Sequence, residues 1–204
     1  MNGDSFEQFF YSLISLFQLP REQNYLNLMG LVGELSVIKH IYLQHGIDIS
    51  PYWHIDGSFS QYDFSLPNKS ALEIKSSSKG DKAVSIKHSQ LFSGPARVCL
   101  TSVQVCEDSS GITLEELINS IRVIKGLCYN LQFEISLQKE LKRVSQEQMR
   151  NKRFILGPIL FFENNRIKPF PVIPENVSSL EYVLDLSDAP QLNDNELSNF
   201  LFLN

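Results

Sequence analysis

The sequence predicts an α/β fold with a core at about 21–106 and a C-terminal α+β elaboration at about 107–204. The 204 residues suffice for one well-packed domain but not for two large ones. A hydrophobic content of 43% and a charged content of 20% are typical of a globular protein and exclude a disordered or collagen-like chain. Helical and alternating hydrophobic patterns follow one another without a Gly/Ser linker or an internal repeat, so a single domain over 1–204 is expected.

Two helices open the predicted fold. Apolar residues at helical spacing follow Asp4, a suitable N-cap, until Leu19-Pro20 interrupts the pattern. From about Arg21 to Gln44, apolar side chains recur at steps of three and four residues, which predicts a longer helix with one buried stripe. His45-Gly46 then provides a helix stop.

Extended segments dominate the rest of the predicted core. After a turn at Pro67–Ser70, the segment Ala71–Lys75 alternates between apolar and polar side chains, as a strand with one buried face does. Arg97–Cys106 is mostly apolar and β-branched, which is typical of a central strand. The other predicted elements are extended segments at 47–50, 59–66 and 84–86, a polar loop at 76–82 and a short helix at 88–92.

The C-terminal elaboration is predicted to alternate helices and strands. Thr113 and Glu116 have the spacing of a capping box, so a helix should begin there and run to about Lys125. The other predicted elements are a helix at 136–150, a strand at 154–163 broken by Gly157-Pro158, a strand at 180–186 and a closing helix at 193–203.

Several protein classes are excluded by what the sequence lacks. The longest uncharged apolar stretches are about ten residues long, too short to span a bilayer. The first residues carry acids ahead of an apolar run, the reverse of a signal peptide. Three cysteines without a CxxC spacing argue against a disulfide framework and against a thiolate zinc site. The expected localisation is a reducing cytoplasm, with no membrane partner.

Charge is distributed unevenly along the chain. The net charge of −5 argues against a nucleic-acid-binding protein that works by bulk attraction. Two segments, 66–97 and 139–153, nevertheless each carry a net charge of +4, whereas 1–65 carries −5. Such segments are either local phosphate-binding surfaces or solvated faces, and charge alone favours the solvated faces.

The residues best suited to chemistry lie in two consecutive predicted strands. Alternation places Glu73 and Lys75 on one sheet face, and a hairpin brings the Asp63 carboxylate close to that of Glu73. Such oxygen ligands suit Mg²⁺, with Mn²⁺ as a substitute, and Glu34 on the preceding helix can complete the site. Lys75 would orient an attacking water and neutralise charge on phosphoryl oxygens. Alternatively, the E-x-K pattern is accidental and forms only a weak polar pair.

Candidate DNA contacts lie next to this group of residues. Lys79 and Lys82 flank a serine-rich loop that can contact a DNA backbone, which would give salt-sensitive affinity without sequence preference. Lys87 and His88 follow, and His88 is either a phosphate contact or an ordinary surface histidine. Trp53 is either a core aromatic residue or a base-stacking one.

The residues around Asp63 resemble a known family. Asp63 followed by Glu73-Ile74-Lys75 is similar to the PD-(D/E)XK signature of the restriction-endonuclease-like nucleases, although Tyr62 stands in place of the proline. The wider pattern resembles a bacterial branch of that superfamily found near phage-defence and restriction genes. The matching residues are Gly30-Leu31-Val32-Gly33-Glu34-Leu35, Trp53, Asp63-Phe64, Glu73-Ile74-Lys75 and Gln90-Leu91.

The resemblance implies a restriction-endonuclease-like mixed β-sheet flanked by helices. It also implies a Mg²⁺-dependent DNA endonuclease of bacterial antiphage defence or restriction. In that interpretation Asp63 and Glu73 bind the metal, and Glu34 matches a helix acid of the same site. Lys75 is the catalytic lysine, and Gln90 supports a metal ligand or touches DNA.

The resemblance also suggests partners and leaves one alternative open. The expected partners are DNA, a second copy of the chain for double-strand cutting, and other proteins of a multi-gene defence system. The alternative is a non-catalytic DNA-binding or scaffold subunit with a relic nuclease fold. Six acids and no Lys or Arg after residue 170 motivate that alternative.

Overall fold

A computed structural model describes residues 21–54, 62–78, 82–93, 97–127, 130–170 and 172–201. Its main feature is a four-stranded mixed sheet of order β1-β2-β4-β5, in which β2 and β4 are parallel and the other two pairs are antiparallel. The elements are α2 Arg21–His45, η1 Ser50–Tyr52, β1 Phe64–Ser65, β2 Ser70–Ser77, β3 Ala83–Lys87, α3 His88–Phe92, β4 Arg97–Thr113, α4 Leu114–Arg122, α5 Leu131–Leu141, α6 Gln146–Asn151, β5 Arg153–Glu163, η2 Asn164–Arg166, β6 Glu181–Asp185 and α7 Asp194–Leu201.

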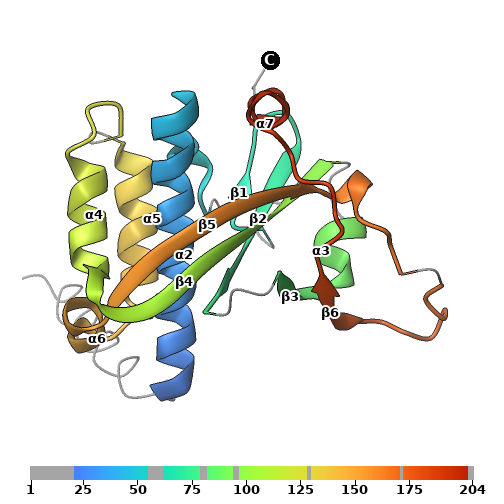
Figure 1. Cartoon of the computed structure of the whole chain (residues 1–204), viewed down its shortest axis with the longest axis horizontal. Helices are drawn as coiled ribbons and strands as arrows, with labels where there is room; N and C mark the ends of the chain where they lie inside the picture. Colours follow the sequence, from blue (N-terminus) through green and yellow to red (C-terminus); the bar gives the residue numbers. More distant parts are fainter. Residues whose placement is uncertain are drawn as a thin grey trace, which may run out of the picture.

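Helices cover both faces of this sheet, which confirms the predicted fold class. Helices α2, α4 and α5 stand on one side, and α3 with the two-stranded β3–β6 sheet lies on the other (Figure 1). Strand β2 contributes to both layers because its side chains alternate. Leu72 and Ile74 join the core under α2, whereas Ala71 joins the core under α3. Among the described helices, none has the length and apolar character needed to cross a bilayer.

The elements with a strong local pattern are found where the sequence places them. Helix α2 runs from Arg21 to His45, and α3 occupies residues 88–92 as predicted. The Thr113 side chain accepts a hydrogen bond from the backbone N–H of Glu116. The Glu116 side chain in turn accepts one from the backbone N–H of Thr113, which completes the capping box at the start of α4. The predicted helix at 4–19 lies outside the described residues.

Three predicted elements differ in the structure. The expected extended segment at 47–50 leads into the helical turn η1, because Asp48 Oδ1 accepts hydrogen bonds from the backbone and hydroxyl of Ser50. The expected strand at 59–66 is confined to Phe64–Ser65 within the described residues. The expected loop at 76–82 begins later, since β2 keeps its parallel pairing with β4 as far as Ser77.

The C-terminal half differs from its prediction at two places. The single helix expected at 136–150 is two helices, because Asn130 caps α5 and Ser145 caps α6 through their side chains. Strand β4 extends past Cys106 to Thr113. The break expected at Gly157-Pro158 is a bulge, because both residues lie opposite Gln104 alone while β5 continues on either side.

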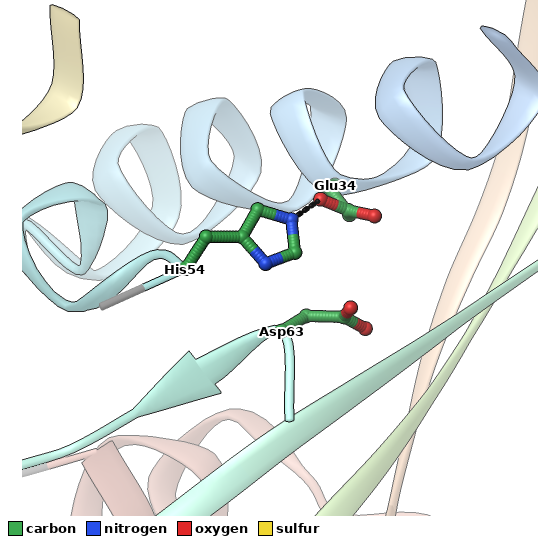
Figure 2. A group of neighbouring side chains, drawn as sticks. All are labelled: Glu34, His54 and Asp63. Atoms are coloured by element: carbon green, nitrogen blue, oxygen red, sulfur yellow. Dashed lines mark hydrogen bonds and ion pairs between the residues drawn. The ribbon is translucent and has the colours of Figure 1, made fainter. Parts of the chain in front are cut away.

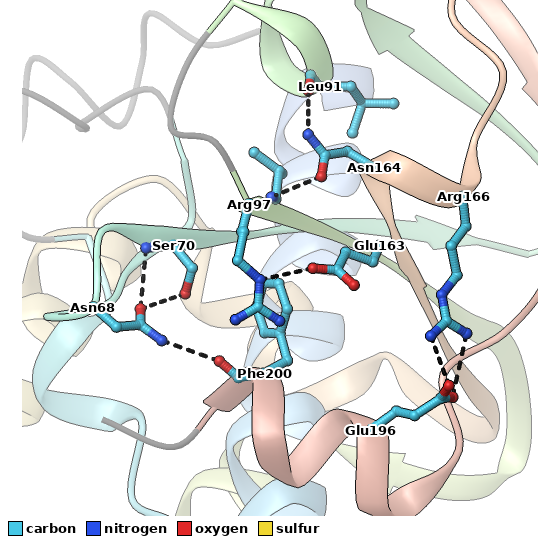
Figure 3. Close-up of polar contacts among 10 residues, drawn as sticks. Asn68, Ser70, Leu91, Arg97, Glu163, Asn164, Arg166, Glu196 and Phe200 are labelled. Carbon is cyan, nitrogen blue, oxygen red and sulfur yellow. Dashed lines mark hydrogen bonds and ion pairs between the residues drawn. The ribbon is translucent and has the colours of Figure 1, made fainter. Parts of the chain in front are cut away.

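Helix α7 is hydrogen-bonded to the turn between β1 and β2 (Figure 3). Asn68 in that turn donates from Nδ2 to the carbonyl of Phe200 at 3.1 Å, and its Oδ1 accepts from the backbone of Ser70 at 3.0 Å. Arg97 lies over the Phe200 ring at 4.6 Å and donates to Glu163 at 2.8 Å. The turn that joins β1 to β2 is therefore tied to α7 through Asn68.

We expect Asn68→Ala to lower the free energy of unfolding by about 1–2 kcal/mol, because it removes the link to Phe200 and the side-chain acceptor of Ser70. The melting temperature should fall by roughly 2–8 °C, measured by differential scanning fluorimetry. Asn176→Ala, at an exposed position, is the control and should leave it unchanged. Equal melting temperatures for the two variants would contradict the role given to Asn68.

Candidate metal centre and active site

The β1–β2 hairpin brings two of the predicted acids together. Phe64 pairs with Leu72 in antiparallel register, so Asp63 at the start of β1 lies opposite Glu73 in β2. The Asp63 carboxylate accepts a hydrogen bond from the backbone N–H of Ile74 at 2.6 Å. That bond fixes Asp63 against β2 and makes its position depend on the hairpin register.

Helix α2 contributes Glu34 from above this hairpin. Its Oε2 accepts hydrogen bonds from Trp53 Nε1 at 2.7 Å and from His54 Nε2 at 2.8 Å. Trp53 is fully buried and bridges to Phe64 of β1, and the His54 backbone N–H donates to the Asp63 carbonyl at 2.9 Å. The segment after η1 therefore connects the helix acid to the hairpin acid.

Glu34, His54 and Asp63 form a group of potential metal ligands (Figure 2). One donor atom from each residue lies within 4.8 Å of those of the other two. In the figure the imidazole lies to one side of the two carboxylates, in contact with that of Glu34. His54 has a φ of +46°, a left-handed conformation that a non-glycine residue adopts only when its surroundings impose it.

Glu73 lies beside this group, in contact with a different set of residues. Its Oε1 accepts from Lys75 Nζ at 2.7 Å and from Gln90 Nε2 at 2.5 Å, so α3 supports the carboxylate from the second face of the sheet. Glu73 is only 3% exposed, and its Oε2 has no hydrogen-bond partner among the described residues. A buried carboxylate oxygen without a partner is unfavourable unless something binds it.

The electrostatics of the site reflect an excess of negative charge. Burial raises the pKa of Asp63 well above its usual value, and the negative charges of Glu34 and Glu73 raise it further. Burial also raises the pKa of Glu73, although Lys75 opposes the shift. For His54, burial alone would lower the pKa, but the hydrogen bond and charge of Glu34 outweigh it and the pKa is raised.

The sequence analysis named most of these residues but missed His54. Glu34 and Asp63 are in the three-residue group, whereas Glu73 lies outside it and holds Lys75 and Gln90 instead. The available signal for His54 was its position next to Trp53 in a segment rich in aromatic residues.

The predicted DNA contacts are spread over the second face. Lys87 is exposed at the end of β3, Lys82 is half-buried, and Lys79 lies outside the described residues. His88 packs against Phe92 in a tilted arrangement, with ring centroids 4.9 Å apart. Lys82 lies just before β3, Lys87 is its last residue and His88 begins α3, and none of the three belongs to the group formed by Glu34, His54 and Asp63.

The second basic segment is largely neutralised. Four of the six cations in 139–153 form ion pairs with acids. The pairs are Arg143–Glu140, Arg150–Glu115, Lys152–Glu107 and Arg153–Glu116. This segment therefore matches the solvated-face interpretation of its charge, and the segment at 66–97 is the better candidate for a phosphate-binding surface.

Comparison with known families agrees with the resemblance seen in the sequence. A family described as “Putative PD-(D/E)XK family member” matches residues 16–187, and the chain belongs to that family. Searches of curated proteins and of solved structures gave no match. The family and the mixed sheet together identify a restriction-endonuclease-like fold.

Proposed function

We propose that this PD-(D/E)XK family member is a Mg²⁺-dependent endonuclease that hydrolyses DNA phosphodiester bonds in bacterial restriction or antiphage defence. One observation carries the proposal. Glu34 of α2, Asp63 just before β1 and Glu73 of β2 lie close enough to act on one another's charges, and Lys75 is the lysine paired with them among the described residues, so the buried negative charge is incompletely balanced. The defence setting rests on the resemblance to a branch found near such genes.

The side chains present fit a divalent metal ion. Carboxylate oxygens are the donors that Mg²⁺ and Mn²⁺ prefer, and Asp63, Glu34 and Glu73 supply them. The unpartnered Oε2 of Glu73 and the raised pKa of Asp63 both indicate carboxylates that lack a cation. When bound, the ion supplies Lewis-acid polarisation of a phosphoryl oxygen and a lower pKa for a bound water.

Lys75 is the residue we propose to act on the scissile phosphate. Its side chain is a quarter exposed and its ammonium group is held by Glu73, so we expect it to reach a bound DNA backbone while staying fixed in place. A positive charge there stabilises the negative charge that develops on the phosphoryl oxygens. Gln90 acts as a positioning residue, since it holds the Glu73 carboxylate that holds Lys75.

Cleavage of supercoiled plasmid tests the proposal. We expect the purified protein to nick or linearise it with Mg²⁺ or Mn²⁺, and EDTA to stop the reaction. Double-strand cutting would require two active sites, so linear product should depend on a homodimer. Intact plasmid in the presence of either ion and of co-purifying partner proteins would favour the non-catalytic scaffold instead.

We expect DNA to contact the β3–α3 edge of the site through Lys82 and Lys87. The double variant Lys82→Ala/Lys87→Ala should weaken binding to unrelated duplexes to a similar extent. It should also reduce the slope of log affinity against log salt by about 2, because about one counterion is released per phosphate contact. Fluorescence anisotropy of labelled duplexes in EDTA measures both.

The matched control for this pair uses the neutralised basic segment. Arg150→Ala/Lys152→Ala removes two cations that are already paired with acids, so DNA affinity should be unchanged. If the control weakens binding as much as Lys82→Ala/Lys87→Ala, the DNA surface lies elsewhere.

A further inference from the structure

We infer that His54 binds the metal ion through Nδ1, and that this imidazole makes the centre prefer Mn²⁺ over Mg²⁺. The inference rests on the proposed function because it concerns the same centre. It adds a ligand that the sequence analysis did not assign and a metal preference opposite to the expected one.

The orientation of the imidazole is the first reason to assign His54 as a metal ligand. Nε2 is occupied by its 2.8 Å bond to Oε2 of Glu34, which fixes the proton on that nitrogen. The ring then presents the lone pair of Nδ1, which lies on the side facing Asp63 (Figure 2). A histidine whose far nitrogen is bound to a carboxylate is the usual arrangement around a protein metal site.

Two further contacts hold this orientation without the ion. Trp53 donates to the same oxygen of Glu34, so the carboxylate is fixed before it contacts the imidazole. The His54 backbone N–H bonds to the Asp63 carbonyl, which keeps the ring at the hairpin. Glu34 therefore positions His54 near Asp63, within a group of side chains that could hold a metal ion.

A separate observation on the neighbouring Glu73 supports a cation near this group. Only 3% of the Glu73 surface is exposed, yet its Oε2 has no hydrogen-bond partner among the described residues. The negative charge of Glu73 acts on Asp63, so Glu73 is an electrostatic neighbour of the group, although it is not one of its three members. A cation beside Asp63 and His54 would relieve both acids.

The donor set determines which ion is preferred. Mg²⁺ is bound through oxygen and exchanges water for nitrogen donors reluctantly. Imidazole suits first-row transition ions, and Mn²⁺ accepts carboxylate and imidazole together. A centre with one nitrogen and two carboxylate donors should therefore bind Mn²⁺ at least tenfold more tightly than Mg²⁺.

Metal titration of the full chain tests this without measuring cleavage. Free Mn²⁺ is followed by electron paramagnetic resonance, and both ions are followed by fluorescence of Trp53, the single tryptophan of the chain and a neighbour of Glu34. His54→Asn places an amide near the position of Nδ1 and tolerates the left-handed backbone. We expect it to lose at least tenfold in Mn²⁺ affinity and less than threefold in Mg²⁺ affinity.

His40→Asn is the matched control, because His40 is also half-buried but packs on Phe161 away from the centre. It should bind both ions as the wild type does. Pulsed electron paramagnetic resonance of the Mn²⁺-loaded wild type adds a test that needs no variant, since a directly bound imidazole gives a ¹⁴N coupling.

The outcomes separate this inference from the proposed function. Absence of a ¹⁴N coupling, equal affinities for the two ions, or unchanged Mn²⁺ affinity in His54→Asn would overturn the role of His54 and leave a carboxylate-only metal site. Failure of the wild type to bind either ion would overturn both. A ¹⁴N coupling that is lost in His54→Asn and retained in His40→Asn would establish His54 as a metal ligand.

Discussion

Lys75→Ala is expected to slow plasmid cleavage by about 10²–10³-fold or more while leaving metal affinity nearly unchanged. The ammonium group contacts Glu73 at 2.7 Å and is absent from the metal-ligand group. Its removal takes away the positive charge proposed to act on the phosphate, but not the donors of the ion. The comparison uses single-turnover nicking rates together with metal titration by Trp53 fluorescence.

Lys152→Ala is the matched control for this variant, because Lys152 also pairs with a glutamate but lies far along the chain in the neutralised segment. It should cleave at the wild-type rate. Lys75→Ala leaves Glu73 buried without its cation, so a melting curve must show that the variant is folded. A folded Lys75→Ala protein that cleaves normally would exclude the proposed role of Lys75.

Asp63→Asn is expected to abolish metal binding and cleavage while making the metal-free protein more stable. The Asp63 carboxylate is held among two other acids, and its pKa in the folded chain is raised by burial and by their charges. The amide keeps an oxygen to accept the Ile74 bond but carries no charge. At neutral pH and without metal, the melting temperature of the variant should therefore lie above that of the wild type.

The direction of the pH effect follows from that raised pKa. The folded chain holds the Asp63 proton more tightly than the unfolded chain does. Stability therefore falls as pH rises from the ordinary aspartate pKa towards the raised one. Glu73, whose pKa is also raised, acts in the same direction. Subtracting the stability–pH profile of Asp63→Asn from that of the wild type isolates the contribution of Asp63 to the pH dependence of stability.

Melting curves in EDTA across this pH range, and again with saturating Mn²⁺, measure both effects. The wild type should gain stability on adding Mn²⁺ and the variant should not. If Asp63→Asn lowers the melting temperature in EDTA, Asp63 is a structural residue whose charge the fold needs.

The sequence predicted those parts of the fold that depend on local patterns. Helix α2 and strand β2 carry their own periodicity, so their positions followed from it directly. The division into α5 and α6 did not, because it depends on a side-chain bond from Ser145 that competes with a continuous helical pattern. The extension of β4 depends on pairing with β5, a contact between distant segments.

The candidate site likewise has residues that the sequence predicts and one that depends on a tertiary contact. Asp63, Glu73 and Lys75 are separated by a short hairpin, so spacing alone brought them together in the sequence analysis. His54 joins Glu34 only because η1 returns the chain to α2 after 20 residues, and that return is a tertiary contact. The periodicity within one helix or strand does not indicate which distant segments come into contact.

The contact between Asn68 and Phe200 has a consequence for how the protein is made. All candidate metal ligands lie between residues 34 and 73, yet the turn that sets the hairpin is tied to a helix at 194–201. During synthesis on the ribosome, the hairpin lacks this tie until residues 194–201 have also emerged. We expect incomplete translation products to carry every ligand but no well-formed centre. For an enzyme that cuts DNA, such a delay would spare the chromosome from unfinished copies.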